Sequence, residues 1–81
     1  NRVVPAAELD VAVMGLARPI LEASPLTVRI GKEAFYSQIS LSEEEAYGVA
    51  VRVMTANACE HDAQEGMGAF LAKRAPKWTG V

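Results

Sequence analysis

The spacing of the apolar residues is the feature that most constrains the fold of this chain. Half of its 81 residues are hydrophobic (51%), and they recur at the three- and four-residue intervals of an amphipathic helix rather than alternating as in a strand. One such face is formed by Leu9, Val13, Leu16 and Ile20. We therefore predict an all-α fold with about four helices, forming one domain over residues 1–81.

Proline and serine residues mark where the expected helices begin and end. Pro5 suits the first turn of a helix, while Pro19 lies inside the first apolar face and predicts a kink or an early end. The pair Ser24-Pro25 offers a capping oxygen followed by a proline at the first helical position. Ser42 and Glu45 have the spacing of a capping box, so a third helix should start there.

The second helix carries two apolar stripes, which predicts burial on more than one side. The stripes are Leu26, Ile30 and Ala34, and Val28, Phe35 and Ile39. Gly31 between them suggests close packing against another helix. We also expect the aromatic residues Phe35, Tyr36 and Tyr47 to pack in a core. Four short helices cannot bury so many apolar faces, so we expect the chain to self-associate.

The last helix should begin near Asp62 and stop before Pro76. Lys73 and Arg74 would complement the dipole at its C-terminal end. Phe70 and Lys73 are three residues apart, which places both on one face of a continuous helix. The apolar side of this helix is expected to be Met67, Phe70 and Leu71.

Few residues in the chain can perform chemistry. Cys59 is the single cysteine and His61 the single histidine. On one helix the two would point to different sides, so neither a nucleophile pair nor a zinc site is expected. We predict that Cys59 is a small buried residue, that His61 lies at the surface, and that the chain has no catalytic residue, metal or cofactor. The net charge of −2 predicts no surface for nucleic acid or anionic membranes, and no apolar run is long enough to span a bilayer.

The strongest sequence signal lies near the C-terminus. Residues 64–78 read QEGMGAFLAKRAPKW, which resembles the ending EGMxAFLEKRxPxW of the crotonase family, the enoyl-CoA hydratases and isomerases. Ala72 stands where the family pattern has glutamate. The start of the chain, residues 1–5, resembles the family's LVNxVVP, the last strand before the C-terminal helices. A start of this kind, without methionine, suggests a chain cut out of a longer one.

Two further segments resemble the second C-terminal helix of the family, namely Ser24-Pro25-Leu26 and Gly31-Lys32. Residues 31–36, together with Ala46-Tyr47, look closest to the branch of enoyl-CoA hydratase domain-containing proteins. The resemblance implies the C-terminal helical region of a crotonase fold, without the spiral core of β-β-α units. In the family the oxyanion hole and the catalytic acids lie in that core, so no acid of this chain, including Glu65, is given a catalytic role.

The resemblance also implies what this segment does in a complete protein. It would supply contacts of a homo-oligomer, a trimer or hexamer, cover the active site and form part of the acyl-CoA site. The position of Phe70 lies near the adenine of CoA bound to a neighbouring subunit, and that of Lys73 lies by the nucleotide phosphates. An aromatic face can stack on a base, and an ammonium group can pair with phosphate.

Two alternatives remain open from the sequence. The chain could be an independent small helical module that binds other proteins, or the end of an inactive crotonase-like scaffold. The main hypothesis is the C-terminal part of a hydratase, lyase or isomerase of fatty acid metabolism, expected in the cytoplasm, or in mitochondria if the organism is a eukaryote.

Overall fold

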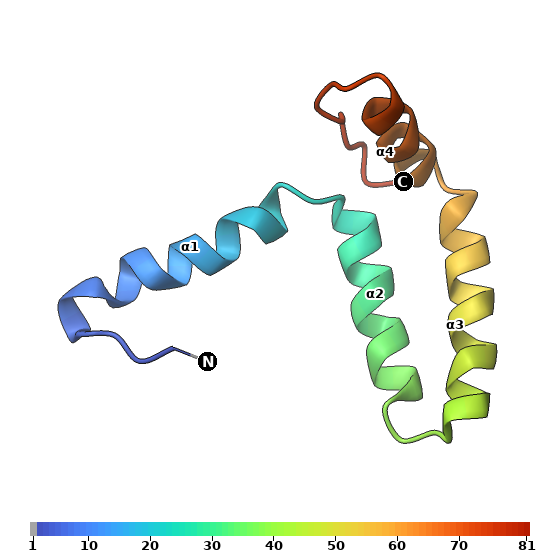
Figure 1. The fold of residues 1–81 in the computed structure, drawn as a ribbon, viewed down its shortest axis with the longest axis horizontal. Coiled ribbons are helices and arrows are strands. Elements are labelled where there is room, and N and C mark those ends of the chain that lie inside the picture. The colour runs from blue at the N-terminus through green and yellow to red at the C-terminus, as the bar shows by residue number, and fades with distance from the viewer. Residues whose placement is uncertain (1) are drawn as a thin grey trace.

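The computed structural model describes residues 2–81 and consists of helices joined by short turns (Figure 1). A 3-10 turn, η1 (Ala6–Glu8), leads into α1 (Leu9–Leu21). The helices α2 (Pro25–Gln38), α3 (Glu43–Ala58) and α4 (His61–Leu71) follow, and residues 72–81, here called the tail, form an extended segment. The prediction of an all-α fold with about four helices is confirmed over the described residues, which contain no strand. Residues 2–4 of the expected strand end are irregular, and Asn1 lies outside the described part.

The helices α2 and α3 form an antiparallel pair that contains most of the internal packing (Figure 1). Leu26 is buried, and Ile30 and Ala34 of the same stripe are half-buried. Ile30 and Ala34 line a small cavity of about 230 Å³ together with Ala50 and Val53 of α3. This stripe therefore packs as predicted.

Capping residues start the helices where the sequence predicts. The Ser24 side chain accepts a hydrogen bond from the Thr27 backbone N–H at 3.2 Å, with Pro25 at the first position of α2. At the start of α3 the Glu45 N–H donates to the Ser42 hydroxyl oxygen at 3.4 Å, and the Ser42 N–H donates to the Glu45 carboxylate at 3.1 Å. The capping box is thus complete. α1 continues past Pro19 for two residues before ending at Leu21.

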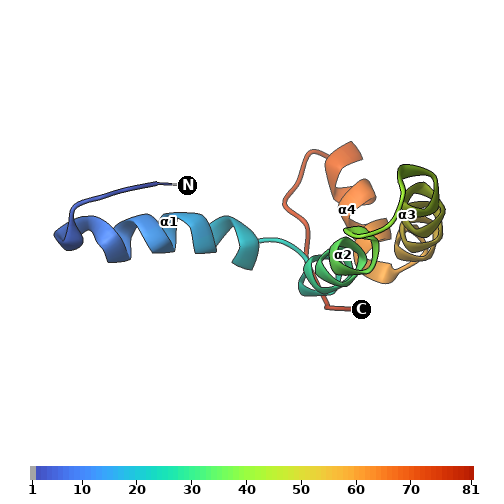
Figure 2. The same cartoon turned by 90° about the horizontal axis from the view of Figure 1, so that it is seen from below.

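The chain does not form a compact globule. Its Cα radius of gyration is 16.2 Å, whereas a globular domain of this length would have a radius of about 12 Å. α1 projects away from the other three helices (Figures 1 and 2). Consequently its predicted apolar face has nothing to pack on, and each of Leu9, Val13, Leu16 and Ile20 is more than half exposed.

Several predictions of burial are wrong for the same reason. Phe35 and Ile39 of the second stripe are exposed, as are Tyr36 and Tyr47. A Cβ built on Gly31 would meet nothing within 4 Å, so close packing does not explain this glycine. The free Cys59 is exposed rather than buried. These residues have the periodicity of packed faces, but the surfaces against which they would pack are absent from residues 2–81.

No single helix among the described residues is long and apolar enough to cross a membrane. α2 and the helical segment Ala6–Leu21 have the length and composition only when taken together, and they meet at 102°.

Candidate functional site

The two residues predicted to bind the nucleotide lie close together at the end of α4, but not on one helical face. Phe70 lies in the last turn, whereas α4 ends at Leu71, before Lys73. Lys73 has a positive φ of 52°, and its N–H donates to the Phe70 carbonyl at 3.1 Å. The Arg74 N–H reaches back to the Ala69 carbonyl at 3.0 Å. This is a Schellman motif, so the prediction that the helix continues through Lys73 is wrong.

Phe70 is not a core residue of this chain. Its side chain is 82% exposed, and its neighbour Leu71 is 81% exposed. The side of α4 that is buried is formed by Ala69 and Asp62, rather than by the apolar side predicted from Met67, Phe70 and Leu71. The exposed Phe70 ring and the exposed Lys73 side chain are both available to a ligand or to another surface.

A buried carboxylate at the start of α4, that of Asp62, connects this helix to two other segments of the chain. Asp62 is 1% exposed and accepts four hydrogen bonds. They come from the Ser24 hydroxyl at 2.5 Å, the Thr79 N–H at 2.7 Å, the Thr79 hydroxyl at 2.9 Å and the Gly80 N–H at 3.0 Å. The Asp62 N–H also donates to the Val81 carbonyl at 2.8 Å. One side chain thus joins α4, the cap of α2 and the tail.

These donors keep Asp62 ionised. Burial by itself would raise the pKa of this carboxyl, but the bonds from Ser24, Thr79 and Gly80 outweigh burial and hold the pKa well below its usual range. Hydroxyl and backbone N–H dipoles therefore compensate the charge, and the His61 Nδ1 lies 3.9 Å from the Asp62 Oδ1. The sequence around Asp62 predicts only a residue of the first helical turn and not this role, because its partner Ser24 lies 38 residues away.

A second carboxylate fastens the middle of the tail. Arg74 makes a bidentate ion pair with Glu65, with nitrogen–oxygen distances of 2.6 and 2.9 Å. The Lys77 N–H donates to the same carboxylate at 2.8 Å. The hydrogen bonds from Arg74 and Lys77 lower the pKa of Glu65 to about 2. Glu65 therefore holds the tail against α4 through both its oxygens.

Trp78 connects the tail to the turn between α1 and α2. Its indole N–H donates to the Glu22 carbonyl at 2.7 Å. Its ring lies over α4 at Gly66, where an added Cβ would come within 3.2 Å of the ring. A side chain at position 66 would therefore fit only if the indole moved by a few tenths of an ångström.

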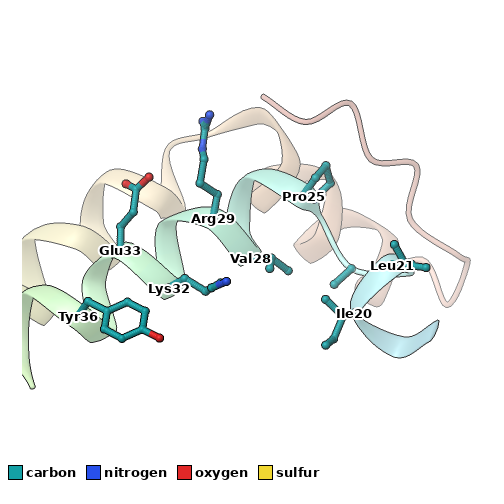
Figure 3. A pocket seen from close by; sticks show the side chains of 9 residues that line it. Ile20, Leu21, Pro25, Val28, Arg29, Lys32, Glu33 and Tyr36 are labelled. Carbon is teal, nitrogen blue, oxygen red and sulfur yellow. The ribbon is translucent and has the colours of Figure 1, made fainter. Parts of the chain in front are cut away.

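A groove of about 750 Å³ lies elsewhere, along the outer side of α2 (Figure 3). Ile20 and Leu21 from the end of α1 form one end of it, and Lys32 and Tyr36 lie further along α2 (Figure 3). The groove is mostly apolar and contains neither Phe70 nor Lys73. The sequence predicted apolar faces here but no groove, because the groove depends on the angle between α1 and α2.

The remaining reactive side chains form no further site. His61 is mostly exposed, as predicted, and its Nδ1 lies 3.1 Å from the Thr79 hydroxyl oxygen. Among residues 2–81, no three His, Cys, Asp or Glu side chains lie close enough together to hold a metal ion.

Comparison with known proteins gives matches over the whole chain. The sequence profile of the family described as enoyl-CoA hydratase/isomerase matches residues 1–81. Human enoyl-CoA hydratase domain-containing protein 3, described as mitochondrial, is 40% identical over 79 residues, which is 98% of this chain and 26% of the human protein. Carnitinyl-CoA dehydratase of Proteus mirabilis is 36% identical over 88 aligned positions, covering 99% of this chain and 32% of that protein.

Solved structures share the helical arrangement. An enoyl-CoA hydratase from Mycobacterium smegmatis superposes with a TM-score of 0.93 at 38% identity, covering 96% of this chain and 30% of that one. Human enoyl-CoA hydratase domain-containing protein 3 superposes with a TM-score of 0.89 at 42% identity, covering 94% of this chain and 30% of that one. The chain therefore spans about a quarter to a third of the proteins that it matches, and the projecting α1 belongs to the shared arrangement.

Proposed function

Because this chain belongs to the enoyl-CoA hydratase/isomerase family, we propose that it is the C-terminal helical part of an enzyme that acts on acyl-CoA thioesters. In the proposed enzyme it supplies the nucleotide end of the CoA site and contacts between subunits. The family match over residues 1–81 argues against the alternative of an independent small helical module that binds other proteins.

The placement of Phe70 and Lys73 carries the proposal for the CoA site. The ring is exposed although it lies on a helix that packs against α2 and α3, and the lysine follows it in a strained backbone conformation. Strained residues held by their surroundings are concentrated at functional sites. Here the Schellman bonds and the Glu65–Arg74 pair provide that support. We propose that Phe70 stacks on the adenine and that Lys73 pairs with the phosphates.

The exposed faces support the proposal for subunit contacts. The faces of α1 and the outer groove of α2 are too apolar to remain in water. We propose that they pack on the rest of the same polypeptide, where they cover the active site, and on neighbouring subunits of a trimer or hexamer. The mitochondrial relatives favour a mitochondrial location if the organism is a eukaryote, while a cytoplasmic location stays a prediction.

Steady-state kinetics of the full-length protein test the CoA site. Phe70→Ala should raise KM for an enoyl-CoA substrate by the stacking free energy of about 1–3 kcal/mol, roughly 5- to 150-fold. Lys73→Ala should raise KM by less, and the effect should shrink with added salt because an exposed phosphate contact is screened. Both changes should affect KM more than kcat, since the nucleotide is remote from the reacting carbons.

Two neighbouring residues provide matched controls. Leu71→Ala removes an equally exposed apolar side chain from the same helix turn, and Lys77→Ala removes an exposed tail ammonium group. Both should leave KM close to the wild-type value. An unchanged KM in Phe70→Ala and Lys73→Ala, with only the melting temperature affected, would refute the assignment of these residues to the CoA site.

A further inference from the structure

The tail folds back along α4 and is fastened at successive points. Arg74 and the Lys77 N–H bind Glu65, the Trp78 ring lies on Gly66, and Thr79 binds Asp62. Lys73 stands at the beginning of this returning segment, and the Asp62 anchor stands at its end. The position of Lys73 therefore depends on contacts made at both ends of the returning segment.

Asp62 cannot itself contact a ligand near Phe70. It is 1% exposed and precedes Phe70 by eight residues, which is about 12 Å along a helix axis. Its carboxylate instead holds three segments together: the start of α4, the end of the tail, and the cap of α2 through Ser24. Ser24 is itself only 4% exposed.

We propose that Asp62 and Ser24 are positioning residues for nucleotide binding, because their buried hydrogen bond fixes the start of α4, whose far end carries Phe70, and the end of the tail, whose beginning carries Lys73. This inference rests on the proposed CoA site. The rigid helix α4 transmits the placement from Asp62 to Phe70, and the closed tail transmits it to Lys73. A shift of about 1 Å is enough to weaken an aligned contact severely.

The bond between Ser24 and Asp62 is suited to this role because it cannot be exchanged for water without rearrangement. Both partners are buried, and no buried side-chain polar atom among residues 2–81 lacks a hydrogen-bond partner. Loss of the Ser24 hydroxyl leaves the Asp62 carboxylate with three donors in a dry environment, so the local structure must shift to compensate. The shift would occur where α2, α4 and the tail meet.

The test compares two ligands of the full-length protein. CoA and pantetheine share the same thiol arm, but only CoA carries the nucleotide. The dissociation constant of pantetheine divided by that of CoA, both measured by competition, reports the contribution of the nucleotide alone. We expect Ser24→Ala to reduce this ratio by about three- to tenfold, a part of the full stacking contribution, and Asp62→Asn to reduce it at least as much. Ser24→Thr, which keeps the hydroxyl, should retain the wild-type ratio.

Ser42→Ala is the matched control. Ser42 also caps a helix through its side chain, but it lies at the start of α3 and contacts Glu45 instead of the tail. It should lower the melting temperature and leave the ratio unchanged. If Asp62→Asn fails to fold, Ser24→Ala decides alone.

The outcomes separate the two proposals. A reduced ratio in Ser24→Ala but not in Ser42→Ala or Ser24→Thr supports the positioning role. A lower melting temperature with an unchanged ratio in Ser24→Ala, while Phe70→Ala does reduce the ratio, overturns the positioning role and leaves the CoA site standing. If Phe70→Ala leaves the ratio unchanged, the proposed CoA site fails and this inference fails with it.

Discussion

Lys73 occupies the left-handed backbone conformation that helix ends usually give to glycine. Lys73→Gly should relieve that strain and raise the free energy of unfolding by about 0.5–1 kcal/mol, after the greater freedom of glycine in the unfolded chain is taken into account. Lys73→Ala keeps the strain and should not stabilise the chain. Thermal unfolding of both variants checks this prediction. If Lys73→Gly were less stable than the wild-type chain, the lysine side chain would stabilise the fold by more than its left-handed backbone conformation destabilises it.

The carboxylates that hold the tail predict a loss of stability in acid. The pKa of Glu65 is lowered from 4.5 to about 2 by its bonds to Arg74 and Lys77, and that of Asp62 is also lowered. A lowered pKa means that the folded state binds fewer protons than the unfolded state. The contribution of Glu65 to the free energy of unfolding is therefore complete above about pH 4.5 and is lost as the pH falls toward 2. Trp78 is the only tryptophan, so its fluorescence reports release of the tail.

Glutamine variants isolate the contribution of Glu65 to this acid transition. Glu65→Gln should flatten the pH dependence between 4.5 and 2, whereas Glu44→Gln, which changes an exposed glutamate on α3, should leave it unchanged. Equal pH profiles for Glu65→Gln and the wild-type chain would contradict the assigned role of Glu65.

Local residue patterns could be read from the sequence, but long-range partners could not. Ser24 and Ser42 were recognisable as caps because a cap acts on backbone groups within the next turn. The bond from Ser24 to Asp62 spans 38 residues, and no local pattern encodes it. The exposed position of Cys59 was missed for a related reason, since burial depends on what covers a side chain.

Gly66 and Gly68 on α4 form a natural matched pair. An added Cβ at Gly68 meets nothing within 4 Å, while at Gly66 it comes within 3.2 Å of Trp78. Gly68→Ala should therefore stabilise the chain by about 0.5–1 kcal/mol through helix propensity. Gly66→Ala should gain nothing or lose stability, because the indole must move.

A double variant separates packing from propensity. In a Trp78→Ala background, Gly66→Ala should stabilise α4 about as much as Gly68→Ala does, as measured by circular dichroism during thermal unfolding. If Gly66→Ala were equally stabilising with Trp78 present, the ring would not pack on α4 as described.

Helix starts were predicted better than helix ends. The starts of α2 and α3 follow capping signals and agree with the structure. The sequence predicts an end of α4 that is too far along the chain, because Lys73 and Arg74 are equally compatible with a basic last turn of the helix. In the structure a backbone turn ends the helix at Leu71, and Arg74 pairs with Glu65. No glycine marks this turn, so the sequence gives no local sign of it.

The exposed apolar faces predict self-association of the 81-residue chain on its own. Leu9, Val13, Leu16 and Ile20 on α1 and the groove along α2 have nothing to pack on among residues 2–81, and such surfaces drive association. Sedimentation velocity should show an oligomer that grows with concentration. A strictly monomeric chain at high concentration would contradict this prediction.

The sequence predicted the helical class, the family and the apolar faces of the helices, but it did not predict which of these faces pack within residues 2–81. Periodicity shows which side of a helix is apolar without showing where its partner lies. Most of the apolar faces have no partner among residues 2–81. Proteins similar to this chain are three to four times longer, since it spans 26% to 32% of those that it matches.

A crystal structure of the full-length protein with CoA bound would test the proposed nucleotide site directly. We predict that the adenine lies against the Phe70 ring, that the Lys73 ammonium group lies within ion-pair distance of a phosphate, and that the thiol arm leads into a neighbouring subunit. An adenine bound elsewhere, with Phe70 packed into a subunit contact and Lys73 facing solvent, would contradict the central claim that this segment forms the nucleotide end of an acyl-CoA site.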